Sequence, residues 1–307
     1  MKAIQFELWT ECNVGCKFCY LHKRARKTPK ADKLREMQKV EDFLRAGDMK
    51  DYNIIGFIGG EFLQGQLHDL EVREKFFILL HIIRDLILEK KLDGMWLSAS
   101  LTQDTFDLRE TLDIFKDVKP EAPTGGFWLS TSYDTKFRFT LKTLSVWKNL
   151  MLGVKENYPN ILCNTTMVLT QDLVEKYLSG EIRFQQFIDE YGTQLFFKPP
   201  HMIYDLFKSK PEMESKLPGF FPKRKDFLEF LTKVYDTEEC WVFDKLCNLN
   251  FRADSLYRSD NEDPESREKG TLYEIAGSEY LPCGHHHSYG AYIDSKACML
   301  CDKLKLK

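Results

Sequence analysis

Short apolar runs alternate with longer amphipathic segments along about the first 200 residues of this 307-residue chain. Polar residues, Gly or Pro separate the runs, as they separate strands from helices in a sequence. The runs predict six strands, at 3–10, 53–58, 95–101, 127–132, 161–169 and 194–198, with helices between them at about 33–47, 68–90, 107–117, 138–157 and 171–190. Strands that alternate with helices predict an α/β protein with a parallel sheet, either a partial (β/α) barrel or an open doubly wound sheet.

The last third of the chain has a different pattern. A stretch punctuated by Pro leads to one predicted helix at about 223–236, and five of the nine cysteines follow it. We therefore predict two domains, a strand–helix domain over 1–205 and a small cysteine-rich C-terminal domain over 206–307.

The overall composition gives no sign of a polyanionic or membrane partner. The 44 Lys and Arg residues nearly balance 47 Asp and Glu residues, for a net charge of -3, so duplex DNA is not an expected partner. The first ten residues alternate like a strand rather than a signal peptide, and no apolar run approaches the roughly 18 to 20 residues of a membrane span. We expect a cytoplasmic protein whose cysteines are metal ligands or buried thiols rather than disulfides.

Three cysteines lie within eight residues, directly after the first predicted strand. Cys12, Cys16 and Cys19 have the spacing C-x3-C-x2-C, and Gly15 relieves backbone strain between them. Three thiolates suit a soft metal site. Two metals remain open: zinc, with His22 as the nearby fourth ligand, or an iron–sulfur cluster whose remaining iron is free to bind substrate or cofactor.

The second predicted strand runs into Gly59, Gly60 and Glu61. Paired glycines allow a backbone to come close to a ligand, and a carboxylate at a strand end can accept hydrogen bonds from an ammonium group. The alternative interpretation is a strand-to-helix turn with an exposed glutamate.

The cysteine motif after the first strand, followed by Gly-Gly-Glu after the second, resembles the radical S-adenosylmethionine (SAM) enzymes over about residues 3–200. The resemblance implies a partial (β/α)6 TIM-like barrel. It implies that Cys12, Cys16 and Cys19 ligate a [4Fe–4S] cluster, with Tyr20 as the aromatic neighbour of the last ligand beside the cofactor, and that SAM binds the open iron.

Further parts of the sequence are similar to this family. The resemblance implies that Glu61, with the backbone of Gly59 and Gly60, holds the amino group of SAM. It also implies that Ser132 or Asp134, at the end of the fourth strand, binds the ribose hydroxyls. The third strand, "LSASLTQ" (97–103), lacks the Asn-Gly turn that often ends it in the family.

The C-terminal cysteines predict a second metal site. Cys298 and Cys301 form a C-x2-C pair after Cys283, and Cys240 or Cys247 can complete a four-ligand set. This spacing is common to zinc and iron–sulfur ligands. The segment resembles the SPASM or twitch tails of radical SAM enzymes, which implies one auxiliary [4Fe–4S] cluster formed by Cys283, Cys298, Cys301 and either Cys247 or Cys240, with zinc as the alternative.

Several histidines, one lysine and one cysteine outside these motifs also have side chains that can bind ligands or react. One residue of 285–287 is expected near the auxiliary site or substrate, unless all three are solvated loop histidines. His201 follows the sixth strand, at the functional edge, and Lys198 faces either the barrel interior or solvent. We expect His81 to be an ordinary helix residue and Cys163 to be a buried thiol in the fifth strand.

The resemblance implies hydrogen abstraction from a substrate, most plausibly a peptide or protein that is modified. It also implies a small electron donor such as a flavodoxin or ferredoxin. Two alternatives remain: the same chemistry on a nucleoside or nucleic-acid base, and a zinc-stabilised binding protein without catalysis.

Overall fold

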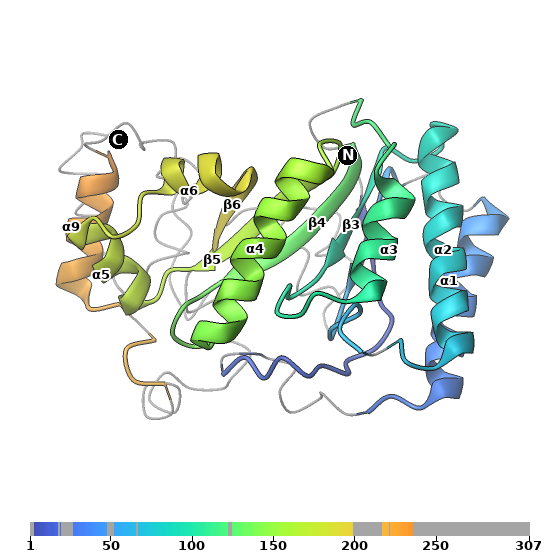
Figure 1. Ribbon diagram of the computed structural model, residues 1–307, viewed down its shortest axis with the longest axis horizontal. Coiled ribbons are helices and arrows are strands. Elements are labelled where there is room, and N and C mark those ends of the chain that lie inside the picture. The colour runs from blue at the N-terminus through green and yellow to red at the C-terminus, as the bar shows by residue number, and fades with distance from the viewer. Residues whose placement is uncertain are drawn as a thin grey trace, which may run out of the picture. The chain divides into compact units, whose positions relative to one another are not determined.

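The computed structural model describes residues 3–17, 19, 27–47, 52–65, 67–121, 125–198, 217–220 and 222–235. Its strands are β1 (Ala3–Glu7), β2 (Ile54–Ile58), β3 (Gly94–Ser98), β4 (Gly126–Tyr133), β5 (Leu162–Val168) and β6 (Thr193–Lys198). Its helices are α1 (Lys30–Ala46), α2 (Leu70–Leu88), α3 (Phe106–Phe115), α4 (Leu141–Asn157), α5 (Gln171–Ser179), α6 (Phe184–Tyr191) and α9 (Arg224–Tyr235) (Figure 1). The predicted alternation of strands and helices is confirmed.

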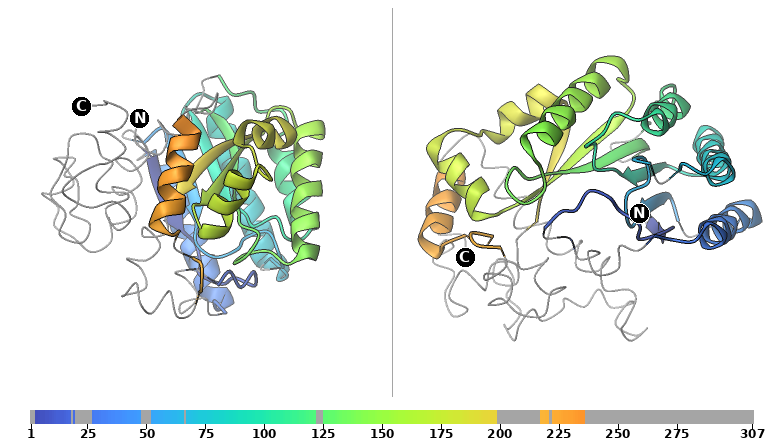
Figure 2. Two further views of the ribbon diagram at one scale, coloured as in Figure 1. Left: turned by 90° about the vertical axis from the view of Figure 1, so that its left-hand side faces the viewer. Right: turned by 60° about the horizontal axis from the view of Figure 1, so that its bottom comes forward.

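The six strands form one sheet in the sequential order β1-β2-β3-β4-β5-β6. Neighbouring strands are parallel, with Phe6 opposite Phe57, Phe57 opposite Leu97, and Leu97 opposite Leu129. A doubly wound sheet reverses its strand order part-way, whereas right-handed crossovers in sequential order place every helix on the same face. Figure 2 shows α1 to α4 on one face of strands β1 to β4. This α/β arrangement is compatible with a partial TIM-like barrel.

The chain divides into two compact units. The first unit comprises Met1–Thr166 and Phe187–Leu195, and the second comprises Met167–Gln186 and Phe196–Lys307. The predicted domain boundary between residues 205 and 206 lies outside the described residues, so it stays a prediction.

Aromatic side chains form the core between sheet and helices in the first unit. Phe57 of β2 packs on Phe76 of α2 with ring centroids 6.2 Å apart, and Phe127 of β4 stacks on Phe115 of α3 at 4.2 Å. All four rings are completely buried. Burial of apolar surface on this scale is the main stabilising term of such a layer.

One predicted helix is two helices in the structure. The sequence predicted a single helix over 171–190, but α5 ends at Ser179 and α6 begins at Phe184. Gly180 has a φ of 85°, the left-handed conformation that commonly ends a helix. Arg183 then donates to the carbonyl of Tyr177 at 2.8 Å, which satisfies a backbone oxygen at the helix end.

The second unit has its own aromatic cluster, around α5 and α9. Tyr177 stacks on Phe184 at 4.8 Å, and Phe230 of α9 meets Tyr177 edge-on at 5.1 Å. The Gln171 side chain accepts from the backbone N–H of Lys223. The helix predicted at 223–236 is therefore confirmed as α9.

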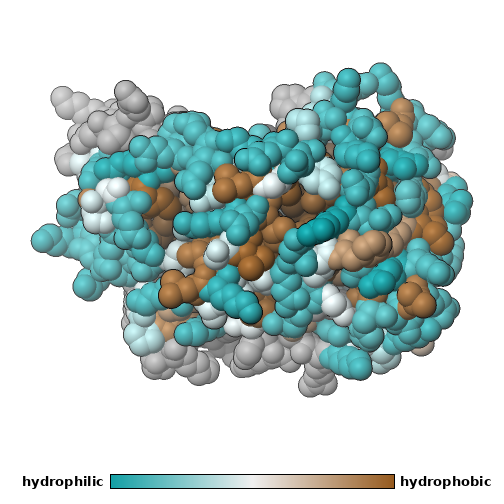
Figure 3. Space-filling view, viewed as in Figure 1, coloured by the Kyte–Doolittle hydropathy of each residue, from teal (hydrophilic) through white to brown (hydrophobic). Residues whose placement is uncertain are grey.

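The outer surface of the helix layer is mixed. Figure 3 shows hydrophilic side chains over α3 and α4 with smaller hydrophobic areas between them. Leu141 and Phe106, at the first positions of α4 and α3, are exposed. None of the helices in the described part of the chain has the length and apolar character needed to cross a bilayer.

Candidate functional site

The segment that holds the first two cysteines runs along the carboxyl ends of the strands. After β1 ends at Glu7, residues 8–17 follow the lower edge of the sheet in Figure 1. The backbone N–H of Lys17 donates to the carbonyl of Phe137, in the turn after β4, at 2.9 Å. The carboxyl edge is where α/β proteins of this kind gather their functional groups. The cysteine motif thus lies where the sequence predicted it.

Backbone hydrogen bonds attach this segment to the Gly-Gly-Glu segment. Gly60 N–H donates to the Trp9 carbonyl at 2.8 Å, and Glu61 N–H donates to the Glu11 carbonyl at 2.9 Å. In return, the indole Nε1 of Trp9 donates to the Glu61 carbonyl at 3.0 Å. The two accepting residues, Trp9 and Glu11, are two positions apart, whereas the two donors are adjacent. The β1–β2 pairing therefore continues past the strand ends with one extra residue in the first segment, as in a β-bulge.

The two glycines are needed for this close approach. A Cβ at Gly59 would lie 2.3 Å from the Trp9 carbonyl oxygen, and one at Gly60 would lie 2.0 Å from that of Glu11. Gly59 also has a φ of 137°, a conformation that side chains disfavour. From the sequence, we expected Gly59 and Gly60 to let the backbone come close to a ligand. In the structure, the group that comes close is the backbone of the cysteine segment.

Glu61 is a buried carboxylate held by backbone donors. Only 2% of the residue is exposed. Its Oε1 accepts from the N–H groups of Phe62 and Leu63, both at 3.1 Å, and its Oε2 accepts from Ser100 N–H at 2.7 Å. Burial raises the pKa of Glu61, against the lowering effects of Ser100, Leu63 and Arg138. The alternative of an exposed glutamate in a turn is wrong. Three backbone N–H groups thus fix the orientation of this carboxylate, and a hydrogen bond from the Ser100 side chain also lowers its pKa.

A cluster of buried polar side chains, which includes Gln64 and Thr102, adjoins Glu61 through Ser100. The Thr102 hydroxyl lies 2.6 Å from the side-chain amide of Gln64 in either amide orientation, and both residues are buried. Asn13, between the first two cysteines, donates to the Gln64 carbonyl at 2.8 Å. Leu101 has a φ of 55°, left-handed for a residue with a side chain. The third strand therefore makes a left-handed turn here without the glycine that usually supplies it.

The cysteines themselves are half-buried or buried. Cys16 is buried, Cys12 and Cys19 are half-buried, and Cys19 N–H donates to the Cys16 carbonyl at 3.1 Å. Burial raises the pKa of Cys12 to about 11, a hydrogen bond from the Val14 backbone lowers it, and Glu61 and the other two thiols raise it further. Burial also raises the pKa of Cys16, while the nearby Arg138 lowers it. The three thiols thus lie within electrostatic range of one another and of Glu61.

The donor chemistry fits an iron–sulfur cluster or zinc, because three thiols share one loop. Among the residues that the structure describes, no three His, Cys, Asp or Glu side chains are grouped closely enough to hold a metal ion. Binding must therefore draw the three sulfurs together and remove their protons. Tyr20 and His22 lie outside the described residues.

Asp134 shapes the turn after β4. It is 5% exposed, and its Oδ1 accepts from the N–H groups of Lys136, at 3.0 Å, and Phe137. This oxygen is therefore engaged by the turn itself. Ser132, the other residue expected at the ribose, lies on β4 and is half-buried.

The sequence analysis missed Arg138, which the same turn carries. Its Nε is buried and has no hydrogen-bond partner among the described residues. Its positive charge lowers the pKa of both Cys16 and Glu61, so the guanidinium lies within electrostatic range of both groups. A buried N–H without an acceptor is costly, and it offers a donor for an anionic group. No motif surrounds Arg138 in the sequence, so only the fold could identify it.

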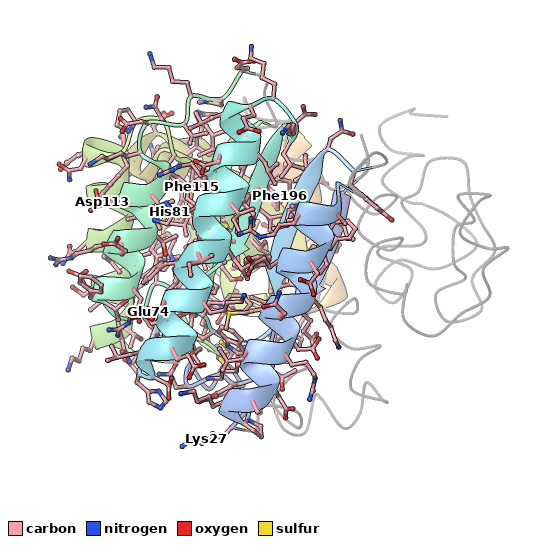
Figure 4. All side chains as sticks on the ribbon, turned by 90° about the vertical axis from the view of Figure 1, so that its right-hand side faces the viewer. Lys27, Glu74, His81, Asp113, Phe115 and Phe196 are labelled. Carbon is pink, nitrogen blue, oxygen red and sulfur yellow. The ribbon has the colours of Figure 1, made fainter. Side chains whose placement is uncertain are left out.

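The remaining expected residues divide between those described and those outside. His81 is exposed on α2, as an ordinary helix residue (Figure 4). Cys163 in β5 is 4% exposed, and burial raises its pKa to about 12. Both predictions are confirmed. The following lie outside the described residues and stay predictions: the Lys198 side chain, His201, Cys240, Cys247, Cys283, His285–His287, Cys298 and Cys301.

Two comparisons with known proteins are negative. No protein-family model matches the chain, and no curated protein is similar to it at a significant level. Any functional assignment must therefore be argued from the chemistry of its own residues.

Proposed function

We propose that this chain is a radical SAM enzyme built on a partial (β/α)6 TIM-like barrel. Cys12, Cys16 and Cys19 would ligate a [4Fe–4S] cluster, and Glu61 would hold the amino group of SAM. The observation that carries the proposal is the hydrogen-bonded attachment of the cysteine segment to Gly59–Glu61, which sets three thiols and one buried carboxylate at the same sheet edge. Bound there, the cluster and SAM would together supply a radical that abstracts hydrogen from a substrate.

The residues of the chain have three tasks in this proposal. Glu61 would attract an ammonium group through its negative charge, in an orientation that backbone donors fix. Arg138 has a buried Nε–H that none of the described residues accepts, and it would donate to an anionic group bound near Cys16. Trp9, whose ring packs edge-on against Phe62 at 5.0 Å, holds the backbone of Glu61 through its indole N–H.

We propose a peptide or protein as the substrate and a small flavodoxin- or ferredoxin-like protein as the electron donor. The C-terminal cysteines Cys283, Cys298 and Cys301, with Cys247 or Cys240, would hold an auxiliary [4Fe–4S] cluster. These parts rest on the sequence resemblance. A nucleoside or base is the alternative substrate, and zinc in place of iron is a competing outcome of the experiments below.

The first experiment measures iron, sulfide and zinc, with electron paramagnetic resonance after reduction. It compares anaerobically prepared wild type with the Cys12→Ala/Cys16→Ala/Cys19→Ala variant. We expect about eight irons in the wild type and about four in the variant, because each cubane cluster holds four. A SAM-sensitive signal should be present only in the wild type. Wild type that holds zinc and no iron after reconstitution would exclude radical SAM chemistry and favour the zinc-stabilised binding protein.

A second experiment isolates Glu61. Glu61→Gln should keep the iron content of the wild type but weaken or lose the SAM-induced change in the resonance spectrum, since a neutral amide cannot form an ion pair with an ammonium group. Glu71→Gln, on exposed α2 surface, is the matched control and should behave as wild type. An unchanged SAM response in Glu61→Gln would remove Glu61 from the cofactor site.

A further inference from the structure

Glu11, the residue directly before Cys12, connects several parts of the fold. Its carbonyl accepts from the N–H of Glu61 at 2.9 Å. Its side-chain Oε2 accepts from the backbone N–H of Thr28 at 3.2 Å. Glu11 and Thr28 flank residues 12–27, which contain all three cysteines of the motif. One carboxylate oxygen therefore closes the base of the cysteine loop.

Lys33 completes this closure from α1. Its Nζ lies 2.8 Å from the same Oε2 of Glu11, and its side chain is only 4% exposed. The ammonium also lies 5.1 Å from the ring centroid of Trp9, a favourable cation–π distance. Other lysines of α1 differ: Lys39 pairs with Glu36 while 64% exposed. A solvated pair of that kind contributes little, whereas a buried ammonium that loses its partner is strongly destabilising.

We propose that the Lys33–Glu11 ion pair is a positioning device for the metal site. It fixes the base of the cysteine loop against Gly59–Glu61, so Lys33 acts on the cysteines through Glu11 without touching them. That the loop carries metal ligands rests on the proposed function. The contacts of Glu11 with Thr28 and Lys33 at the base of the loop do not. The ion pair joins two side chains of the protein itself.

The test follows the accessibility of individual thiols in the full-length protein without added metal. Iodoacetamide labels native protein over time, and mass spectrometry of the digested chain gives a rate for each cysteine. The variants are Lys33→Met and Glu11→Gln, and the control is Lys39→Met, the same change in an exposed pair on the same helix. Cys163, buried in β5, reports any general loosening of the domain.

We expect Cys12 and Cys16 to be labelled at least about tenfold faster in both variants, because each removes the low-exposure ion pair that holds Glu11 at the base of the loop. Cys163 should keep its wild-type rate, and Lys39→Met should change neither. Unchanged labelling of Cys12 and Cys16 would overturn the proposal. Equal acceleration of Cys163 would also overturn it, since the pair would then support the whole domain rather than the loop.

A second measurement connects the device to metal binding. After reconstitution with iron and sulfide, the rate at which a chelator removes iron should be about tenfold higher in Lys33→Met than in wild type or Lys39→Met. Equal rates of iron removal would deny Lys33 its positioning role. If the wild type takes up no iron, the proposed function fails, while the labelling experiment still decides whether the pair closes the loop.

Discussion

The two faces of the sheet in the first unit differ sharply. On the face toward the helices, Met95, Leu97, Phe127 and Leu129 are completely buried. On the opposite face, Ser98 and Ser130 are half-buried, and other polar side chains are partly or fully accessible. Residues alternate between the two faces along each strand.

The opposite face has two further features. Trp96 lies across β2, where a Cβ on Gly56 would approach its indole to 2.2 Å. Nearer the carboxyl edge, the Ser130 hydroxyl donates to the side-chain oxygen of Asn164 at 2.7 Å. Parallel strands covered on both faces read as nearly continuous apolar runs. β3 and β4 instead carry the half-buried Ser98 and Ser130 toward their carboxyl ends, so one face forms the core while the other has polar groups near the edge where the cysteines lie.

The largest expected effect is on the helix-covered face. Phe127→Ala removes the ring that stacks on Phe115 at 4.2 Å, and it should lower the free energy of unfolding by about 3–5 kcal/mol because it opens a cavity in a dry core. Urea unfolding, followed by circular dichroism, measures this loss. A loss below about 1 kcal/mol would mean that this face is less tightly packed than its burial indicates.

The next effect concerns Gly56, whose missing side chain makes room for Trp96. Gly56→Ala should cost about 1–3 kcal/mol through overpacking. Combining it with Trp96→Leu should recover most of the loss, because the smaller side chain vacates the position. A double-mutant cycle on unfolding free energies measures the coupling, and additive losses would show that the indole does not occupy this space in solution.

On the helix-covered side of the sheet, charged side chains form ion pairs between neighbouring helices. Glu41 of α1 pairs with Lys75 of α2, and also with Arg45 at 2.6 Å. The hydrogen bond from Lys75 lowers the pKa of Glu41 despite its partial burial. A lowered carboxyl pKa stabilises the folded state above the unfolded value, about pH 4.3, and this stabilisation is lost as the pH falls through the folded pKa.

Glu41→Gln should therefore lower the unfolding free energy by about 1 kcal/mol at pH 7, and by clearly less at pH 3. Unfolding in urea at both pH values gives the difference between variant and wild type. Glu74→Gln, at an exposed position of α2, is a control for the substitution itself. A difference that stays constant with pH would show that packing, not charge, is responsible.

The smallest effect is expected on the face away from the helices. Ser98→Ala should change the unfolding free energy by no more than about 0.5 kcal/mol, as substitutions outside a packed core usually do. Leu97→Ala, one residue earlier and on the opposite face, should cost about 2–5 kcal/mol. Similar losses at the two positions would contradict the division of the sheet into two unlike faces.

Strand and helix positions could be predicted from the sequence because hydrophobic periodicity reports burial directly. Each strand lies within a few residues of its expected range. The single helix over 171–190 was wrong because Gly180 adopts a left-handed conformation that local periodicity does not reveal. The sequential strand order could not be predicted from periodicity either, because a partial barrel and an open doubly wound sheet have the same hydrophobic pattern.

The site was predictable as residues but not as contacts. Cys12, Cys16 and Glu61 lie at the expected sheet edge, yet the reason for Gly59 and Gly60 is the backbone of Trp9 and Glu11. That proximity depends on pairing between distant segments. Arg138 and Lys33 have no sequence signature at all, because their importance arises from burial and from neighbours supplied by other elements.

The hydrogen bond from Lys17 to Phe137 has a kinetic consequence. The two residues are far apart along the chain, and contacts of large sequence separation form slowly because loop closure must precede them. Helices and the first strand pairs can form earlier from nearer neighbours. The cysteine segment thus gains its final support only after the chain has been completed through the turn that follows β4, so its native conformation should arise late during folding.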